Sequence, residues 1–160
     1  AVVGGGDTAC EEATYLAGIC KKVYMIVRRD VLRASEAMQE RVRNTENIEV
    51  LWNCNTQEVL GDEYGVTGAR LVRKDGEVFD IAVDGFFLAI GHHPNSDVFR
   101  EWIEVDKEGY IVTDGKTSKT NVPGVFAAGD VQDPLYRQAI TAAASGCRAA
   151  LDAEKFLKML

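Results

Sequence analysis

A short apolar segment followed at once by three glycines most constrains what this chain can fold into. Ala1-Val2-Val3 has the composition of the end of a buried strand, and Gly4-Gly5-Gly6 follows it directly. From Asp7 to about Gly18, apolar residues recur at helical spacing. A glycine turn between a strand and a helix leaves the first N–H groups of the helix free to bind an anion. The sequence therefore predicts a strand–turn–helix unit with an anion-binding turn.

The elements that follow alternate between strand and helix, and then become a run of strands. A continuous apolar stretch after the first helix is typical of a parallel strand that is buried on both faces. The predicted elements are a strand at 23–27, a helix at 34–43, a strand at 48–52, and three antiparallel strands at 57–60, 66–73 and 77–83. Asp75-Gly76 is a turn signal between the last two strands. The predicted fold class is α/β, a Rossmann-like three-layer dinucleotide-binding domain with an inserted antiparallel β-meander.

The second part of the chain begins after a further predicted buried strand at 86–90. Gly91 and Pro94 break regular structure there, so we predict one domain at 1–91 and another at 92–160. In the second domain we expect a short strand at 110–113 and a long helix at 137–157. The apolar face of that helix is predicted to comprise Ile140, Ala143, Ala144, Cys147, Ala150 and Leu151.

Composition excludes several classes of protein. The net charge is -7, which argues against a nucleic-acid partner. No apolar run approaches the roughly 20 residues that a membrane-spanning helix needs. None of the four cysteines forms a Cys-x-x-Cys pair. Cys10 and Cys20, about 15 Å apart along one predicted helix, cannot form a disulfide, which needs Cα atoms within about 7 Å.

The glycine motif has a chemical and a structural interpretation. In Gly4-x-Gly6-x-x-Ala9, Gly4 permits a tight turn, Gly6 lets the backbone approach a pyrophosphate, and Ala9 allows close packing of helix on strand. Such a turn also occurs in a purely structural role. Its place between a strand and a helix of a βαβ unit favours a dinucleotide.

Three arginines stand where the second strand ends. Arg28, Arg29 and Arg33 carry guanidinium groups, which stay charged and offer fork-shaped donors to a phosphate. The alternative is a solvated basic patch. Their position at the strand end favours the 2′-phosphate of NADP.

Gly129-Asp130 and Arg137-Gln138-Ala139 form the third candidate group. A strand that ends in Gly-Asp can direct a carboxylate to a ribityl or ribose hydroxyl, and N–H groups at a helix start can face an electron-rich ring. A structural turn is an equally good explanation. His92-His93 has no cysteine or carboxylate at a zinc-binding spacing, so we expect no metal.

Together these motifs resemble the low-molecular-weight NADPH-dependent thioredoxin reductases. The resemblance covers essentially all 160 residues, in order. It rests on the segments 3–13, 27–35, 89–95, 123–131 and 136–139. It implies that 1–91 is an NADPH-binding domain with a truncated first strand, and that 92–160 is the C-terminal segment of an FAD-binding domain. The chain would then be a piece of a longer protein.

The resemblance also implies an activity and roles for individual residues. In that family NADPH reduces FAD, FAD reduces a Cys-x-x-Cys pair, and the pair reduces the disulfide of thioredoxin. Carried over by position, the NADP-binding residues are Gly4, Gly5, Gly6, Asp7, Thr8, Ala9, Arg28, Arg29, Arg33, Ile90 and Gly91, and the FAD-binding residues are Asp130, Arg137, Gln138 and Ala139. We further expect thioredoxin as partner, a homodimer of the full-length protein, no membrane association, and a cytoplasmic location.

The chain departs from the family pattern in two ways. Val27 stands where many members have a histidine, and the Cys-x-x-Cys pair is absent. We therefore expect no catalytic residue in this chain and no complete reaction by it alone. Most of the expected FAD cradle is also missing. The alternatives are a related NADPH flavoprotein, either ferredoxin–NADP reductase-like or peroxiredoxin-reducing, and a non-catalytic NADP-binding module.

Overall fold

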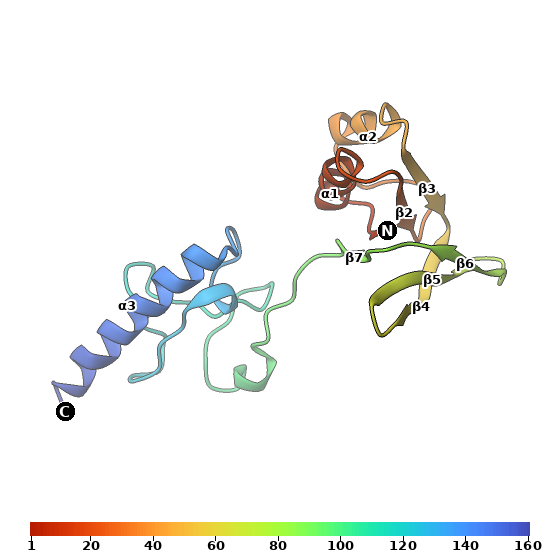
Figure 1. Cartoon of the computed structure of the whole chain (residues 1–160). Helices are drawn as coiled ribbons and strands as arrows, with labels where there is room; N and C mark the ends of the chain where they lie inside the picture. The colour runs from red at the N-terminus through yellow and green to blue at the C-terminus, as the bar shows by residue number, and fades with distance from the viewer. The chain divides into compact units, whose positions relative to one another are not determined.

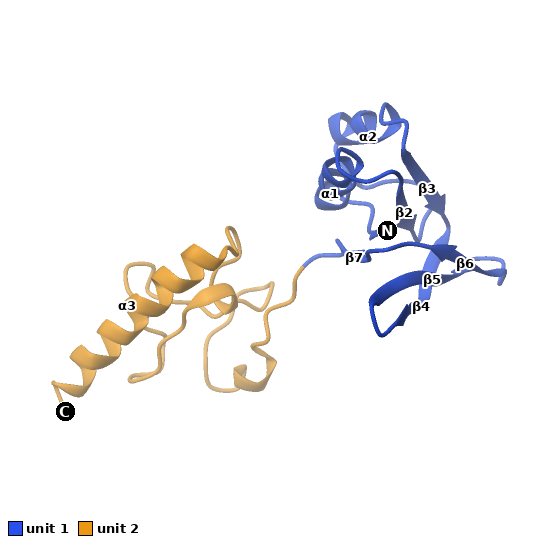
Figure 2. Ribbon diagram, viewed as in Figure 1, with its two compact units in different colours: residues 1–91 blue, residues 92–160 orange.

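The computed structural model describes residues 1–160, which form two compact units, Ala1–Gly91 and His92–Leu160 (Figure 2). They are called here the N-terminal unit and the C-terminal unit, and each is described by itself. None of their helices combines the length and the apolar character that crossing a membrane requires.

A four-stranded parallel sheet is the centre of the N-terminal unit. Its strands are β1 (Val2–Val3), β2 (Val23–Val27), β3 (Ile48–Trp52) and β7 (Phe87–Leu88). They lie in the order β3-β2-β1-β7, and every neighbouring pair is parallel. A parallel sheet that extends outward on both sides of its first strand is characteristic of the Rossmann type of fold. The predicted fold class is confirmed.

Side chains on opposite faces of this sheet form two separate apolar cores. Val23, Met25 and Val27 of β2 face the helices α1 (Asp7–Ala17) and α2 (Glu36–Arg43). Ile26, between them in sequence, faces the other way. This alternation follows from the two-residue period of a strand, and it makes β2 apolar throughout. Figure 1 shows α1 and α2 on one side of the strands and the meander on the other.

The meander that covers the second face consists of β4 (Cys54–Asp62), β5 (Gly65–Arg73) and β6 (Val78–Ala82). Both neighbouring pairs are antiparallel, as predicted. Cys54, Ala69 and Leu71 turn inward to pack with the strands of the parallel sheet. The predicted strand at 57–60 therefore begins earlier, at Cys54. A register shift between Thr56 and Glu58 interrupts its pairing with β5.

The C-terminal unit has little regular structure apart from one helix. It contains two single-turn 3₁₀ helices, η1 (Asp97–Phe99) and η2 (Gly129–Val131), and the long helix α3 (Ala139–Leu157). Its buried apolar core consists of Ile103, Ile111 and Ala127, with valines packed around it. Polar contacts attach α3 to the loops. Ser145 Oγ accepts a 2.8 Å bond from the Gly129 N–H, and the Asp152 carboxylate accepts bonds from Ser118 N–H and Oγ–H.

Two predicted strands were wrong in extent or in kind. The predicted buried strand at 86–90 is reduced to β7, whose residues Phe87 and Leu88 are exposed because β7 is the edge of its sheet. The predicted strand at 110–113 is a single bridge between Val105 and Ile111. Asp106 Oδ1 accepts bonds from the N–H groups of Glu108 and Tyr110, so the residues between the two bridge partners form a turn.

Both later helices also differ from prediction. The helix predicted at 34–43 begins at Glu36, with Ser35 as its N-cap. The predicted apolar face of α3 lies entirely in solvent in this unit, and Ile140 is 78% exposed. The opposite face packs on the loops instead, through Ser145, Asp152 and Phe156. Periodicity located the helix correctly but not the face that this unit buries.

Candidate functional site

The glycine turn after β1 is shaped by close backbone packing on one side and open space on the other. At Gly4 (φ +148°), a Cβ would overlap the carbonyl oxygen of Ala89 and lie 2.8 Å from the Ala9 Cβ. At Gly6, a Cβ would meet nothing within 4 Å. Gly6 is the N-cap of α1 and makes no side-chain capping bond. The turn therefore leaves an accessible helix N-terminus, which suits a phosphate.

The segment after β2 is fixed onto this turn by its backbone. The Gly5 carbonyl accepts hydrogen bonds from the N–H groups of Arg33 (2.6 Å) and Ala34 (3.1 Å). Asp7 Oδ1 accepts two more, from Ser35 N–H (2.9 Å) and Oγ–H (2.7 Å). These bonds from Ser35, the backbone bond first, hold the pKa of Asp7 below its usual value. An ionised carboxylate is an anion that only accepts hydrogen bonds, so Asp7 can contact a phosphate only through its backbone N–H.

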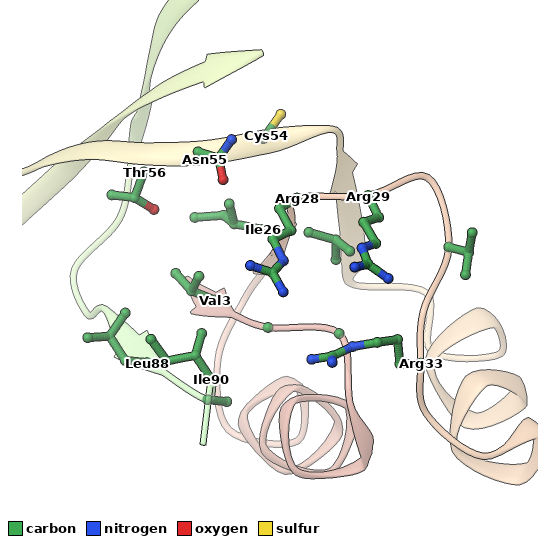
Figure 3. Close-up of a pocket in the computed structure, with 15 residues that line it drawn as sticks. Val3, Ile26, Arg28, Arg29, Arg33, Cys54, Asn55, Thr56, Leu88 and Ile90 are labelled. Atoms are coloured by element: carbon green, nitrogen blue, oxygen red, sulfur yellow. The ribbon is translucent and has the colours of Figure 1, made fainter. Parts of the chain in front are cut away.

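A cavity of about 440 Å³ opens beside the glycine turn, within the range of about 300–1,000 Å³ that small-molecule sites occupy. Its lining residues come from the turn and from the ends of β1, β2, β4 and β7. They are Val3, Gly4, Gly5, Ile26, Val27, Arg28, Arg29, Val31, Arg33, Cys54, Asn55, Thr56, Leu88, Ala89 and Ile90. Figure 3 shows the three arginine side chains reaching into this space.

The three arginines are free to bind an anion. Arg28, Arg29 and Arg33 are exposed, and no carboxylate lies within 4.0 Å of any of them. Val27, the last strand residue before them, is buried and apolar, so it offers no carboxylate to a ribose hydroxyl. Three unpaired guanidinium groups beside one cavity form a strongly anion-attracting site.

The far rim of the cavity was not found by sequence reasoning. Cys54, Asn55 and Thr56 are the first three residues of β4 and precede the strand predicted at 57–60. Burial raises the pKa of the Cys54 thiol, whose S–H donates to the Trp52 carbonyl at 3.2 Å. Thr56 Oγ1 is inaccessible to solvent and has no hydrogen-bond partner. No local motif marks these residues, because only the packing of the meander brings them to the cavity.

The structure brings together some, but not all, of the residues proposed from the sequence for NADP. Those that line the cavity are Gly4, Gly5, Arg28, Arg29, Arg33 and Ile90. Gly6, Asp7 and Thr8 lie at the start of α1 outside the cavity lining, and Ala9 is fully buried against Gly4. Gly91 follows β7, is exposed, and does not line the cavity.

A second hollow, of about 370 Å³, lies within the C-terminal unit. Asp130 and Arg137 both line it, together with His92, His93, Pro94, Asn95, Tyr110 and Val131. Arg137 has a left-handed backbone (φ +48°), and its Nη1 donates to the Tyr110 hydroxyl at 3.4 Å. Gln138 and Ala139 do not line the hollow. Gln138 is the N-cap of α3, in a capping box with Thr141, and Ala139 is the first helical residue.

Ser145 supports the loop that carries Asp130. Its hydroxyl accepts from the Gly129 N–H and donates to the Ala142 carbonyl, both at 2.8 Å. Gly129 has φ +74°, so the turn at η2 depends on a glycine and on this bond. Ser145 belongs to none of the motifs named in the sequence analysis, and its side-chain role was missed.

The sheet order, the glycine turn and the arginine-lined cavity define a dinucleotide-binding unit of the Rossmann type. Comparison with known proteins narrows this class. The family model described as pyridine nucleotide-disulphide oxidoreductase matches residues 1–146. The chain therefore belongs to the pyridine nucleotide-disulphide oxidoreductase family.

Similar proteins of known identity are thioredoxin reductases. That of Debaryomyces hansenii is 52% identical over 158 residues, which are 98% of this chain and 49% of the relative. The crystal structure of the Streptococcus pyogenes enzyme matches 99% of this chain and 52% of its own, with a TM-score of 0.83 and 36% identity. The structure of the Giardia duodenalis enzyme matches 98% of this chain and 52% of its own, with a TM-score of 0.74 and 48% identity. The chain spans about half the length of the curated relatives it matches.

Proposed function

We propose that this chain is the NADPH-binding part, with an adjoining FAD-binding segment, of a flavoprotein thioredoxin reductase. In the full-length protein, hydride would pass from NADPH to FAD, and electrons would pass on to a Cys-x-x-Cys pair and the disulfide of thioredoxin. Thioredoxin reductases about 50% identical over nearly the whole chain support this proposal. The four cysteines of this chain are all unpaired, and Cys10 and Cys54 are buried, so the reducing pair would lie elsewhere in the full-length protein.

The observation that carries the NADPH assignment is that the glycine turn, which contributes Gly4 and Gly5 to the cavity and leads directly into α1, lies beside the three arginines. The glycine turn supplies the accessible N-terminus of α1 for the pyrophosphate. Arg28, Arg29 and Arg33 surround the place for the 2′-phosphate. When bound, NADPH supplies the hydride. This chain's residues bind and orient its adenosine half, and the bonds from Arg33 and Ala34 to Gly5 keep the two anion sites in register.

For FAD we propose Asp130, Arg137, Gln138 and Ala139 in the full-length protein. Asp130 and Arg137 already share one hollow, and Ser145 fixes the turn that carries Asp130. An exposed carboxylate there suits a ribityl hydroxyl, and the first N–H groups of α3 suit an electron-rich ring edge. On this proposal, residues 1–91 form the NADPH domain and 92–160 the FAD segment. A homodimer in the cytoplasm completes the proposal for the full-length protein.

The NADPH assignment is tested by removing two charges from the cavity. In the Arg28→Gln/Arg29→Gln double variant, each lost charge-assisted bond is worth about 1.5–3 kcal/mol. The dissociation constant of NADPH is therefore expected to rise about a hundredfold or more. NADH lacks the 2′-phosphate, so its affinity should change little. Isothermal titration of the 160-residue chain with both nucleotides measures the difference.

A matched control separates this local effect from a change in net charge. Arg41 and Arg148 are exposed and line neither the arginine cavity nor the hollow around Asp130. The Arg41→Gln/Arg148→Gln variant carries the same loss of two charges and should keep the parent affinity for NADPH. If the Arg28 and Arg29 substitutions weakened NADPH and NADH equally, the 2′-phosphate assignment would be wrong.

A further inference from the structure

Arg137 has a backbone conformation that arginine rarely adopts. Only two residues other than glycine have a positive φ, Asn53 (+56°) and Arg137 (+48°). Asparagine enters this left-handed region readily, whereas an arginine is crowded there by its Cβ. Such a conformation persists only where the surrounding structure holds it, and ligand-binding sites are a common place for it. The contacts that hold Arg137 therefore bear on the use of the hollow that it lines.

The carboxylate of Asp133 holds the segment that leads to Arg137. Its Oδ1 accepts hydrogen bonds from the N–H groups of Leu135 (2.9 Å) and Tyr136 (3.0 Å). Such bonds from an aspartate to the N–H groups that follow it close a tight turn. They also hold the pKa of Asp133 below its usual value, the bond from Tyr136 first. The turn thus fixes the backbone from which the side chain of Arg137 extends.

The hydroxyl of Tyr110 holds the other end of Arg137. Tyr110 is buried, and its hydroxyl accepts a hydrogen bond from Arg137 Nη1 at 3.4 Å. No carboxylate lies within 4.0 Å of the Arg137 guanidinium. A guanidinium has several N–H donors, so one bond to Tyr110 leaves the others for a ligand. The charge of Arg137 is therefore held in place and is not neutralised by the protein.

We propose that Asp133 and Tyr110 are positioning residues that hold Arg137 in place for FAD before the cofactor binds. Asp133 acts on the backbone and Tyr110 on the side chain. A long side chain that is already held loses less conformational freedom when a ligand binds, and this raises the affinity. Asp130 lines the same hollow, so a carboxylate and a guanidinium face one ligand there. This inference rests on the proposed FAD site and adds to it two residues that touch no part of the cofactor.

The first test measures the affinity of the full-length protein, freed of flavin, for added FAD by the quenching of flavin fluorescence. Tyr110→Phe removes the hydroxyl and keeps the ring, and it should raise the dissociation constant about two- to tenfold. Arg137→Gln should raise it about tenfold or more, because a charge-assisted bond is lost. The matched control is Tyr64→Phe, which should keep the parent affinity, because Tyr64 is 90% exposed between β4 and β5.

Combining the substitutions shows whether Tyr110 acts through Arg137. If it does, adding Tyr110→Phe to the Arg137→Gln variant should change the dissociation constant by less than about twofold. A purely structural role would weaken binding by the same factor with and without Arg137.

The second test separates the hydrogen-bonding role of Asp133 from its charge. Asp133→Ala removes the acceptor of the turn and should raise the dissociation constant of FAD by about the same factor as Tyr110→Phe. Asp133→Asn keeps an acceptor oxygen at the same place and should bind within about twofold of the parent.

The proposal is supported if Tyr110→Phe weakens FAD only when Arg137 is present and Asp133→Asn restores what Asp133→Ala loses. It is overturned by parent affinity in Tyr110→Phe or Arg137→Gln, by equal weakening in both backgrounds, or by an Asp133→Asn variant no better than Asp133→Ala. In each of these cases a parent protein that binds FAD, and binds it less tightly as Asp130→Asn, keeps the FAD assignment. Failure of the parent protein to bind FAD overturns both.

Discussion

The two units differ in the interactions that attach their helices to the rest of the unit. In the N-terminal unit, α1 and α2 cover a continuous apolar core of ten buried residues on one face of the parallel sheet. In the C-terminal unit only three apolar residues form the buried core, and none of them belongs to α3. The bonds of Ser145 and Asp152 to Gly129 and Ser118, together with the single edge-on contact of Phe156 with Phe126, attach α3 instead.

This difference shows where each unit draws its stability. Burial of apolar area contributes about 25 cal/mol per Å², so two cores on one sheet stabilise the N-terminal unit through packing. One hydrogen bond contributes about 0.5–1.5 kcal/mol, which is less than the burial of a large apolar side chain, and its contribution depends on its geometry. The C-terminal unit also leaves the apolar residues Ile140 and Leu151 of α3 in solvent. We expect packing changes to dominate in the first unit, and polar or pH changes in the second.

The largest expected effect is that of a core truncation in the N-terminal unit. Leu71 is fully buried between the meander and the parallel sheet. Leu71→Ala should lower the free energy of unfolding of this unit by about 2–5 kcal/mol, through lost burial and a residual cavity. The chain has two tryptophans, Trp52 in the N-terminal unit and Trp102 in the C-terminal unit. Urea unfolding in a Trp102→Phe background therefore follows the N-terminal unit alone.

The control for this prediction lies on the same sheet. Val78 of β6 is 52% exposed, so Val78→Ala should change the unfolding free energy of that unit far less. In a Trp52→Phe background, Leu71→Ala should leave the Trp102 transition in place. If Leu71→Ala shifted both transitions equally, the two units would unfold as one. The proposed difference in what stabilises them would then be wrong.

Local patterns predicted the elements of the N-terminal unit well. The predicted strands at 23–27 and 48–52 match β2 and β3, and β2, inside the sheet, is the continuous apolar run of a strand that is buried on both faces. The strand at 86–90 has the same pattern, yet Phe87 and Leu88 are exposed. A continuous apolar run indicates a buried strand, but it does not show which element of the chain covers that strand.

The candidate site residues that belong to one short motif lie together at the cavity, and their role in binding stays a prediction. Gly4, Gly5, Arg28 and Arg29 belong to short motifs at strand ends, and all four line the cavity. Thr56 reaches the cavity only through the pairing of β4 with β5 and the register shift there, which no local pattern reveals. Ser145 was missed for a similar reason, since its partner Gly129 is distant in sequence. Sequence motifs thus located the arginine side of the cavity and Ile90, but not the residues that β4 contributes.

Acid should unfold the C-terminal unit before the N-terminal unit. Hydrogen bonds lower the pKa of three carboxyl groups in the C-terminal unit, Asp114 through Thr117, Asp133 through the N–H of Tyr136, and Asp152 through the N–H of Ser118. Only Asp7 is affected in this way in the N-terminal unit. A carboxyl group with a lowered folded pKa contributes stability that is complete above its unfolded pKa of about 3.9. That stability is lost as the pH falls through the folded pKa.

The measurement is urea unfolding of each single-tryptophan chain between neutral pH and pH 3. The Trp102 transition is expected to move to lower urea at a higher pH than the Trp52 transition. Asp152→Asn keeps an acceptor oxygen but cannot titrate, so it should flatten the pH dependence of the C-terminal unit. If the Trp52 transition moved first instead, hydrogen-bonded carboxylates would not be the main difference between the units.

The smallest expected effect tests whether the apolar face of α3 is free in solution. Ile140 is 78% exposed, so Ile140→Ser should change the unfolding free energy of the C-terminal unit by no more than about 0.5 kcal/mol. Phe156 on the same helix packs edge-on against Phe126, with ring centroids 6.1 Å apart, and Phe156→Ala should cost clearly more. Urea unfolding followed by Trp102 compares the two. A loss above about 1 kcal/mol for Ile140→Ser would mean that this face is covered in solution, since an exposed isoleucine has little burial to lose.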